Sequence, residues 1–214
     1  MTYSKRTYLI LECALLFFCL PFAFYSARHH LAYRIIPLVC CLALGCYFYL
    51  KSKRRDSPEV VLEKAELGRH LKAMLLLFIL SAPFLLLITY IAFPDLFLAF
   101  PQKRPYRWAL VFVLYPLSTY PQEIIFRGFF FQRYESLFAH PLGLIIVNGL
   151  SFGLMHMVYG NWIAPILCTI GGLLFAYRYQ KTQSLFLVSL EHGLWGTFLY
   201  TIGLGWFFYS GSIV

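Results

Sequence analysis

The sequence has few charged residues. Only 13% of its 214 residues are Asp, Glu, Lys or Arg, whereas 60% are hydrophobic and 20% are aromatic. A soluble globular domain carries about 25% charged and about 45–50% apolar residues. This shortage of charge excludes an ordinary water-soluble domain, because the surplus apolar surface has to face lipid. The lipid bilayer is therefore the first partner that the composition predicts.

Acidic residues are scarcer than basic ones, and the formal net charge is +9. Binding to nucleic acid is nevertheless rejected, because it needs Lys and Arg clustered on one folded face. Here the basic residues lie in short loops between apolar runs. That distribution is typical of the positive-inside rule, and more of the basic residues fall inside if the N-terminus is cytoplasmic. We therefore expect an integral membrane protein with a cytoplasmic N-terminus.

The six Cys residues include no CxxC pair, and all of them lie inside apolar runs. This spacing is not that of a disulfide framework or a metal site. Thiols in a membrane helix behave as small apolar groups. No small-residue cleavage site follows the first apolar run, so we expect that run to be kept as the first helix.

Seven apolar runs are candidates for membrane spans, since about 20 apolar residues cross a hydrocarbon layer of about 30 Å. They cover residues 8–25, 33–50, 71–93, 108–131, 142–158, 162–177 and 185–208. An eighth helix results if Pro116 and Pro121 divide the fourth run. The polar connection 51–72 is either a short interfacial helix or a solvated loop. The sequence thus predicts an all-α, polytopic membrane helical bundle of seven or eight transmembrane helices, forming a single membrane domain over residues 1–214.

Ionisable side chains inside these runs are rare, and each costs about 3 kcal/mol or more in lipid, so each suggests a function. Glu123 and Arg127 are four residues apart, which places both on one helical face. They form either a structural ion pair or part of an active site. His156 ends the fifth run, and His192 lies in the seventh run beside Glu191.

One carboxylate and two imidazoles on three separate runs are a set suited to hydrolysis. Glu123, His156 and His192 can activate a water and stabilise an oxyanion. They can alternatively hold a zinc ion with an open position. We assign the base to Glu123 because adjacent helical residues point about 100° apart, so Glu191 does not face the same point as His192. Glu12, near the end of the first run, is expected to reach the membrane interface and to have no chemical role.

Three motifs on separate runs resemble a known family. They read QEIIFR at residues 122–127, FGLMH at 152–156 and HGLWG at 192–196. This order is similar to that of the CPBP group, the CAAX proteases and bacteriocin-processing enzymes, also called Abi proteins. The resemblance covers residues 108–208. Together with the Asn161–Trp pair, the motifs look like a branch with Gln-Glu in place of Glu-Glu in the first motif.

The resemblance implies an intramembrane endopeptidase of the glutamic type, in which Glu and His residues activate a water. Such an enzyme hydrolyses a peptide bond of a membrane-associated protein or peptide, here in a bacterial inner (plasma) membrane. The catalytic residues expected are Glu123, His156 and His192. The supporting residues expected are Gln122, Arg127, Glu191 and Asn161. No cofactor is expected, and the alternative is Zn²⁺ bound by the three catalytic side chains.

Two positions depart from the family pattern. The first glutamate of the first motif is Gln122, which cannot take up a proton at neutral pH, and the Asn or Asp that usually ends the third motif is Gly196. These departures keep a second hypothesis open, a catalytically impaired member that acts as a membrane chaperone, immunity or binding protein. A small transporter or proton channel is a third hypothesis, based only on the intramembrane Glu and His residues.

Overall fold

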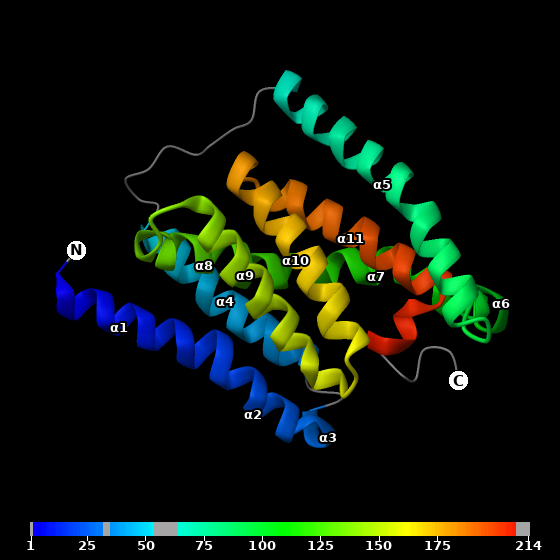
Figure 1. Cartoon of the computed structure of the whole chain (residues 1–214), viewed down its shortest axis with the longest axis horizontal. Coiled ribbons are helices and arrows are strands. Elements are labelled where there is room, and N and C mark those ends of the chain that lie inside the picture. Colours follow the sequence, from blue (N-terminus) through cyan, green and yellow to red (C-terminus); the bar gives the residue numbers. More distant parts are fainter. Residues whose placement is uncertain (1, 32–34, 54–63, 209–214) are drawn as a thin grey trace. The chain divides into compact units, whose positions relative to one another are not determined.

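Every regular element in the described residues is a helix. The computed structural model describes residues 2–31, 35–53 and 64–208 (Figure 1). In chain order the elements are α1 (Tyr3–Ala14), the π-helical η1 (Leu15–Cys19), α2 (Leu20–Ser26), α3 (Arg28–Leu31), α4 (Ile35–Lys53), α5 (Lys64–Ala92), α6 (Ala99–Lys103), α7 (Pro105–Glu123), the π-helical η3 (Ile124–Phe129), α8 (Phe130–Tyr134), the 3₁₀ turn η4 (Glu135–Leu137), α9 (Pro141–Met155), the 3₁₀ turn η5 (His156–Tyr159), α10 (Ile163–Thr182), α11 (Leu185–Ile202) and the 3₁₀ turn η6 (Leu204–Phe208). The predicted all-α class is confirmed.

Within the described part of the chain, five helical segments are long and apolar enough to cross a membrane. They are Tyr3–Ser26, Ile35–Lys53, Glu66–Ala92, Pro105–Leu137 and Pro141–Tyr159. The other two predicted runs coincide with α10 and α11. These segments confirm a polytopic membrane bundle, whereas a total of seven crossings stays a prediction. Helix α7 continues through Pro116 and Pro121, so these prolines do not divide the fourth run. In the connection 51–72, residues 51–53 end α4 and residues 64–72 begin α5, whereas residues 54–63 lie outside the described residues.

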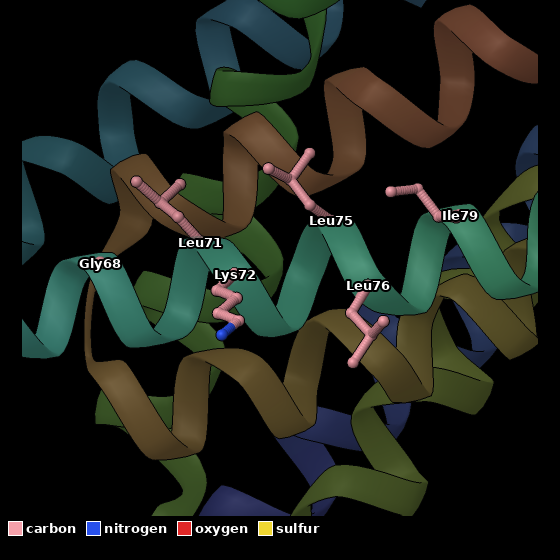
Figure 2. A pocket seen from close by; sticks show the side chains of 6 residues that line it. All are labelled: Gly68, Leu71, Lys72, Leu75, Leu76 and Ile79. Carbon is pink, nitrogen blue, oxygen red and sulfur yellow. The ribbon is translucent and has the colours of Figure 1, made fainter.

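The surface of α5 has the apolar character that lipid requires. Leu80 and Phe84 are 65% and 71% exposed. Figure 2 shows the side chains that line a hollow along this helix, with Leu71 and Leu75 on one side of it and Lys72 and Leu76 on the other. Acyl chains can cover such a face, and a Lys amine can extend along its alkyl stem toward the headgroups.

The described residues form two compact units. The first unit contains α1 to α4 together with the chain from Pro121 to Leu185, which includes η3, α8, α9 and α10. The second unit contains α5, α6, α7 up to Tyr120, and α11 with η6 from Phe186 onward. All six Cys residues are free thiols. The expectation of one membrane domain over residues 1–214 stays a prediction.

In the first unit, an aromatic cluster attaches the first helix to the helix that carries the first motif. Phe17 of η1 makes edge-to-face contacts with Phe126, Phe130 and Tyr134, at ring-centroid distances of 5.6, 4.8 and 5.9 Å. Such pairs contribute about 0.5–1.5 kcal/mol each beyond the area that they bury. The N-terminal helix is therefore part of the support of η3 and α8.

Glu12 strengthens the same attachment by an ion pair. Its two carboxylate oxygens accept hydrogen bonds from Nε and Nη2 of Arg133, at 2.8 and 2.7 Å, and Oε1 also accepts one from the Tyr134 hydroxyl at 2.9 Å. The bidentate geometry is the strongest form of a carboxylate–guanidinium contact. Glu12 thus has a structural partner on α8.

Small residues bring α9 and α10 into close contact, and Figure 1 shows the two helices side by side. A Cβ atom on Gly149 would lie 2.9 Å from the backbone nitrogen of Leu173, and one on Gly172 would lie 3.0 Å from the carbonyl oxygen of Gly149. Membrane helices approach closely where such small residues meet. This contact fixes the position of the Gly172 carbonyl against α9.

In the second unit, α7 packs on α11. The hydroxyl of Thr119 donates a hydrogen bond to the Ser189 carbonyl at 3.3 Å, and the indole N–H of Trp108 donates one to the Thr201 hydroxyl at 3.0 Å. Between these contacts, a Cβ on Gly193 would lie 3.4 Å from Pro116. The three contacts set the register of α7 along α11.

The Glu12–Arg133 pair yields a stability prediction. Glu12→Gln is expected to lower the free energy of unfolding by about 1–3 kcal/mol, because it leaves a partly buried guanidinium with weaker hydrogen bonds. SDS titration in mixed micelles measures this loss. The exchange Glu12→Arg with Arg133→Glu should regain part of it. An unchanged transition in Glu12→Gln would contradict a stabilising ion pair.

Candidate active site

The first motif lies where the helix widens. Helix α7 ends at Glu123, and the next six residues form the π-helical segment η3. A π turn holds more residues than an α turn and is frequent at functional sites. Gly128 within it allows Leu50 of α4 to approach, since a Cβ there would lie 2.8 Å from a Leu50 methyl group.

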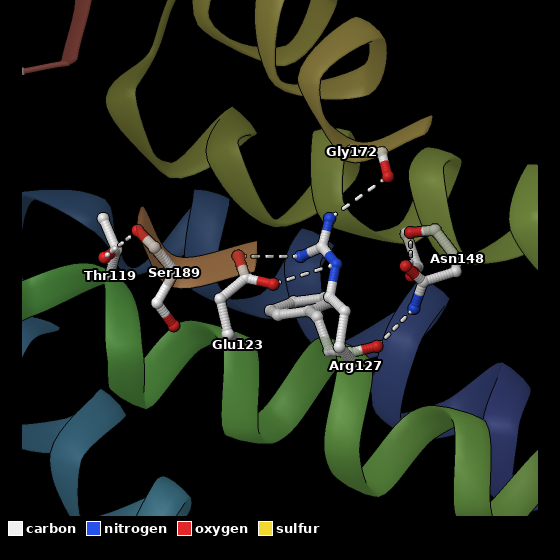
Figure 3. Close-up of polar contacts among 8 residues, drawn as sticks. Thr119, Glu123, Arg127, Asn148, Gly172 and Ser189 are labelled. Carbon is white, nitrogen blue, oxygen red and sulfur yellow. Dashed lines mark hydrogen bonds and ion pairs between the residues drawn. The ribbon is translucent and has the colours of Figure 1, made fainter. Parts of the chain in front are cut away.

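Glu123 and Arg127 form a fully buried ion pair (Figure 3). The guanidinium Nε lies 3.1 Å from Oε2, and Nη1 donates to Oε1 at 3.3 Å. The third nitrogen, Nη2, donates to the carbonyl of Gly172 on α10 at 3.1 Å. Both side chains are 0% exposed. The pairing expected from the four-residue spacing is observed.

Two aromatic rings surround the guanidinium. Its central carbon lies 4.5 Å from the ring centroid of Phe152 and 5.5 Å from that of Phe175. A cation over an aromatic face is stabilised by about 2 kcal/mol when it is desolvated. Phe152 belongs to the second motif, so this contact joins the first two motifs within one unit.

His156 follows directly after this helix, as the first residue of η5. Its ring centroid lies 4.7 Å from that of Phe152, and its Nδ1 lies 2.7 Å from the Phe152 carbonyl oxygen. A carbonyl oxygen can only accept, so Nδ1 carries the proton of this hydrogen bond. In the neutral ring, Nε2 is then the acceptor nitrogen. The half-buried His156 thus has a defined tautomer at the end of α9.

Asn148 is a site residue that the sequence reasoning missed. Its amide donates to the carbonyl of Phe126, inside η3, at 2.5 Å (Figure 3). The side chain is fully buried, and its Oδ1 has no hydrogen-bond partner among the described residues. Asn148, Phe152 and His156 follow one another at intervals of four residues, hence along one face of α9. An amide in so apolar a helix was the signal that could have identified it.

The third motif lies in the second unit. His192 and Glu191 are both buried on α11, at 5% and 0% exposure. The ring of Tyr115, on α7, meets the His192 imidazole edge to face at a centroid distance of 6.1 Å. The preference for Glu123 over Glu191 as base stays a prediction.

The remaining supporting residues differ in their surroundings. Gln122 is half-buried in the last turn of α7. Asn161 stands before α10, and its Oδ1 accepts the backbone N–H of Ala164 at 2.9 Å. That is the contact by which an Asn caps a helix N-terminus, so Asn161 stabilises the start of α10.

A zinc site is one of the hypotheses for the three catalytic side chains. Among residues 2–31, 35–53 and 64–208, no group of three or more His, Cys, Asp or Glu is arranged to hold a metal ion. The zinc alternative requires Glu123 and His156 of the first unit together with His192 of the second. It stays a hypothesis.

Comparison with known proteins supports the motif reading. Residues 102–198 match the family model described as Rce1-like, type II CAAX prenyl endopeptidase Rce1-like. The match covers just under half of the chain and contains all three motifs. This region of the chain is therefore similar to the CAAX prenyl endopeptidases. Searches of curated proteins and of solved structures gave no match. The family predicted from the three motifs is confirmed, and the Gln-Glu branch stays a prediction.

The buried ion pair of Glu123 and Arg127 should respond non-additively to mutation. Arg127→Met is expected to cost about 3–5 kcal/mol of unfolding free energy, because it leaves the Glu123 carboxylate buried and uncompensated. The double variant Arg127→Met with Glu123→Gln should be less destabilised than Arg127→Met alone. SDS titration of the wild type, both single variants and the double variant measures the coupling. Additive losses would contradict the pairing.

Asn148 should support the π-helical segment. Asn148→Leu is expected to lower the unfolding free energy by about 1–3 kcal/mol, since the Phe126 carbonyl loses its buried donor. Ser151→Ala is the matched control, because the Ser151 hydroxyl bonds only to a carbonyl of its own helix, that of Asn148 at 2.8 Å, among the contacts described. A loss no larger in Asn148→Leu than in Ser151→Ala would contradict this function.

Proposed function

We propose that this CAAX-type intramembrane protease hydrolyses a peptide bond of a membrane-associated protein or peptide by the glutamic mechanism. The observation that carries the proposal is the buried Glu123–Arg127 pair, joined through Phe152 to His156. Buried charge in apolar, membrane-spanning helices is costly and marks functional sites. The match to the CAAX prenyl endopeptidase family over the same residues supports it.

Glu123 is the proposed base. Arg127 holds both oxygens of the carboxylate and so fixes its orientation. An ionised carboxylate has about four lone-pair sites, so a carboxylate with two such contacts can still accept a proton from water. A base held in place before the reaction needs no reorganisation when the proton moves.

The two histidines bind the water or the oxyanion in this proposal. His156 presents Nε2 as the acceptor nitrogen, because its Nδ1 is committed to the Phe152 carbonyl. Protonated imidazole can then donate to the tetrahedral oxyanion or to the leaving amine. His192 of the second unit supplies the second imidazole. No cofactor is part of this mechanism.

The competing hypothesis is a catalytically impaired member that acts as a membrane chaperone, immunity or binding protein. It is motivated by Gln122 and Gly196. The family match does not favour it, because the matched proteins are described as endopeptidases. Cleavage by the wild-type protein would end this hypothesis.

Single replacement of each of the three proposed catalytic side chains should strongly slow hydrolysis. For Glu123→Gln, His156→Ala and His192→Ala we expect rate losses of about 10²–10⁴-fold, as for other general acids and bases. The full chain in proteoliposomes is assayed with two fluorogenic probes. One is a farnesylated peptide ending in a CAAX sequence, and the other is a lipid-anchored peptide library without a prenyl group.

Matched controls separate chemistry from general damage. Glu135→Gln and His140→Ala change the same residue types at exposed positions and should retain wild-type rates. Cleavage of the farnesylated peptide alone would assign a prenylated substrate. Retained cleavage in all three active-site variants, or no cleavage of either probe by the wild type, would overturn the proposal.

A further inference from the structure

The face of α11 beside His192 has no side chain one turn further along, at Gly196. A Cβ at this glycine would lie 1.8 Å from Cε1 of Tyr115, 2.2 Å from Cζ and 2.4 Å from the phenol oxygen. No real Cβ contact is this short, so the outer edge of the Tyr115 ring and its hydroxyl occupy the space of a side chain at position 196. A side chain at position 196 would therefore require the Tyr115 ring to move.

Tyr115 is also a neighbour of His192. The two rings meet at an interplanar angle of 79° and a centroid distance of 6.1 Å, and the Tyr115 ring lies 5.4 Å from that of Tyr200. Residues four apart on a helix share a face, so a polar side chain at position 196 would be the neighbour of His192. The hydroxyl of Tyr115 stands in that place instead.

The position of Tyr115 is fixed by the packing of its helix. One residue further along α7, Pro116 contacts the face of Gly193, and one turn further the Thr119 hydroxyl donates to the Ser189 carbonyl. These contacts lie on either side of His192 along the chain. The phenol is therefore held beside the imidazole by the α7–α11 contact within one unit.

We infer that Tyr115 is a positioning residue for His192, and that its hydroxyl supplies the polar group that α11 lacks at position 196. A phenol hydroxyl both donates and accepts hydrogen bonds. It can therefore orient an imidazole, as an amide or carboxyl side chain at position 196 would. The inference rests on the proposed function in one respect, namely that His192 acts in hydrolysis.

The hydroxyl is tested by Tyr115→Phe, which keeps the ring. We expect kcat to fall by about 10²-fold, comparable to the loss of one preorganised donor, with little change in KM or in the SDS unfolding midpoint. Tyr120→Phe, on the exposed part of the same helix, is the control and should retain wild-type kcat.

The shared space is tested by a mutant cycle. Gly196→Ala should displace the phenol and lower kcat as much as Tyr115→Ala does, whereas adding Gly196→Ala to Tyr115→Ala should have little further effect. In the Tyr115→Ala background, Gly196→Asn should restore kcat at least about tenfold, because an amide then fills the place of the phenol. Additive losses and no rescue would overturn the inference.

A readout without catalysis separates this inference from the proposed function. The His192 imidazole resonances, assigned by comparison with His192→Gln, are recorded by NMR of the full chain in detergent micelles. Tyr115→Phe should shift them, and Tyr120→Phe should not. If the wild type cleaves neither probe, the proposed function fails, and the NMR comparison alone decides on Tyr115. Unchanged His192 resonances and unchanged kcat in Tyr115→Phe would overturn the inference.

Discussion

The buried ion pair of Glu123 and Arg127 has no access to water, and lipid offers it no hydrogen bonds. Moving each ion out of water costs roughly several kcal/mol, even after the protein has relaxed around it. The pair therefore needs further partners. The structure provides a carbonyl from α10 and the aromatic rings of Phe152 and Phe175. These partners come from α9 and α10, so both helices have to pack closely against the segment that carries the pair. The close glycine contacts between α9 and α10 meet this requirement.

The π-helical segment adds a second constraint on the same packing. Widening the turn after Glu123 leaves backbone carbonyls outside the regular α pattern, and a buried carbonyl has to find a donor. Asn148 donates to the carbonyl of Phe126. Asn148 and Phe152 lie one turn apart on α9, and His156 follows one turn later at the start of η5. The same helix therefore supplies a donor to the η3 backbone and an aromatic ring to the guanidinium.

The parts of the site that depend on short spacing could be predicted from the sequence. The helices follow from apolar runs, and the Glu123–Arg127 pair follows from a separation of four residues, which is a local property. The π-helical segment and the contact of Tyr115 with position 196 could not be predicted, because they depend on which helices meet. Asn148 itself could have been identified from the sequence, because it is a polar residue in an apolar run and lies four residues before Phe152. Its hydrogen-bond partner, a carbonyl on another helix, could not have been predicted.

The two departures from the family pattern differ in their physical consequences. At position 196, the Tyr115 phenol occupies the volume that a side chain in place of glycine would fill. At position 122 the amide of Gln122 can donate and accept hydrogen bonds but cannot take up a proton. Proton transfer then falls to other groups, and the first unit has two. Glu123 is an oriented carboxylate, and His156 has Nε2 as its acceptor nitrogen. The loss of an acid at position 122 therefore removes one proton acceptor, and the Glu123 carboxylate and the His156 imidazole stay in place.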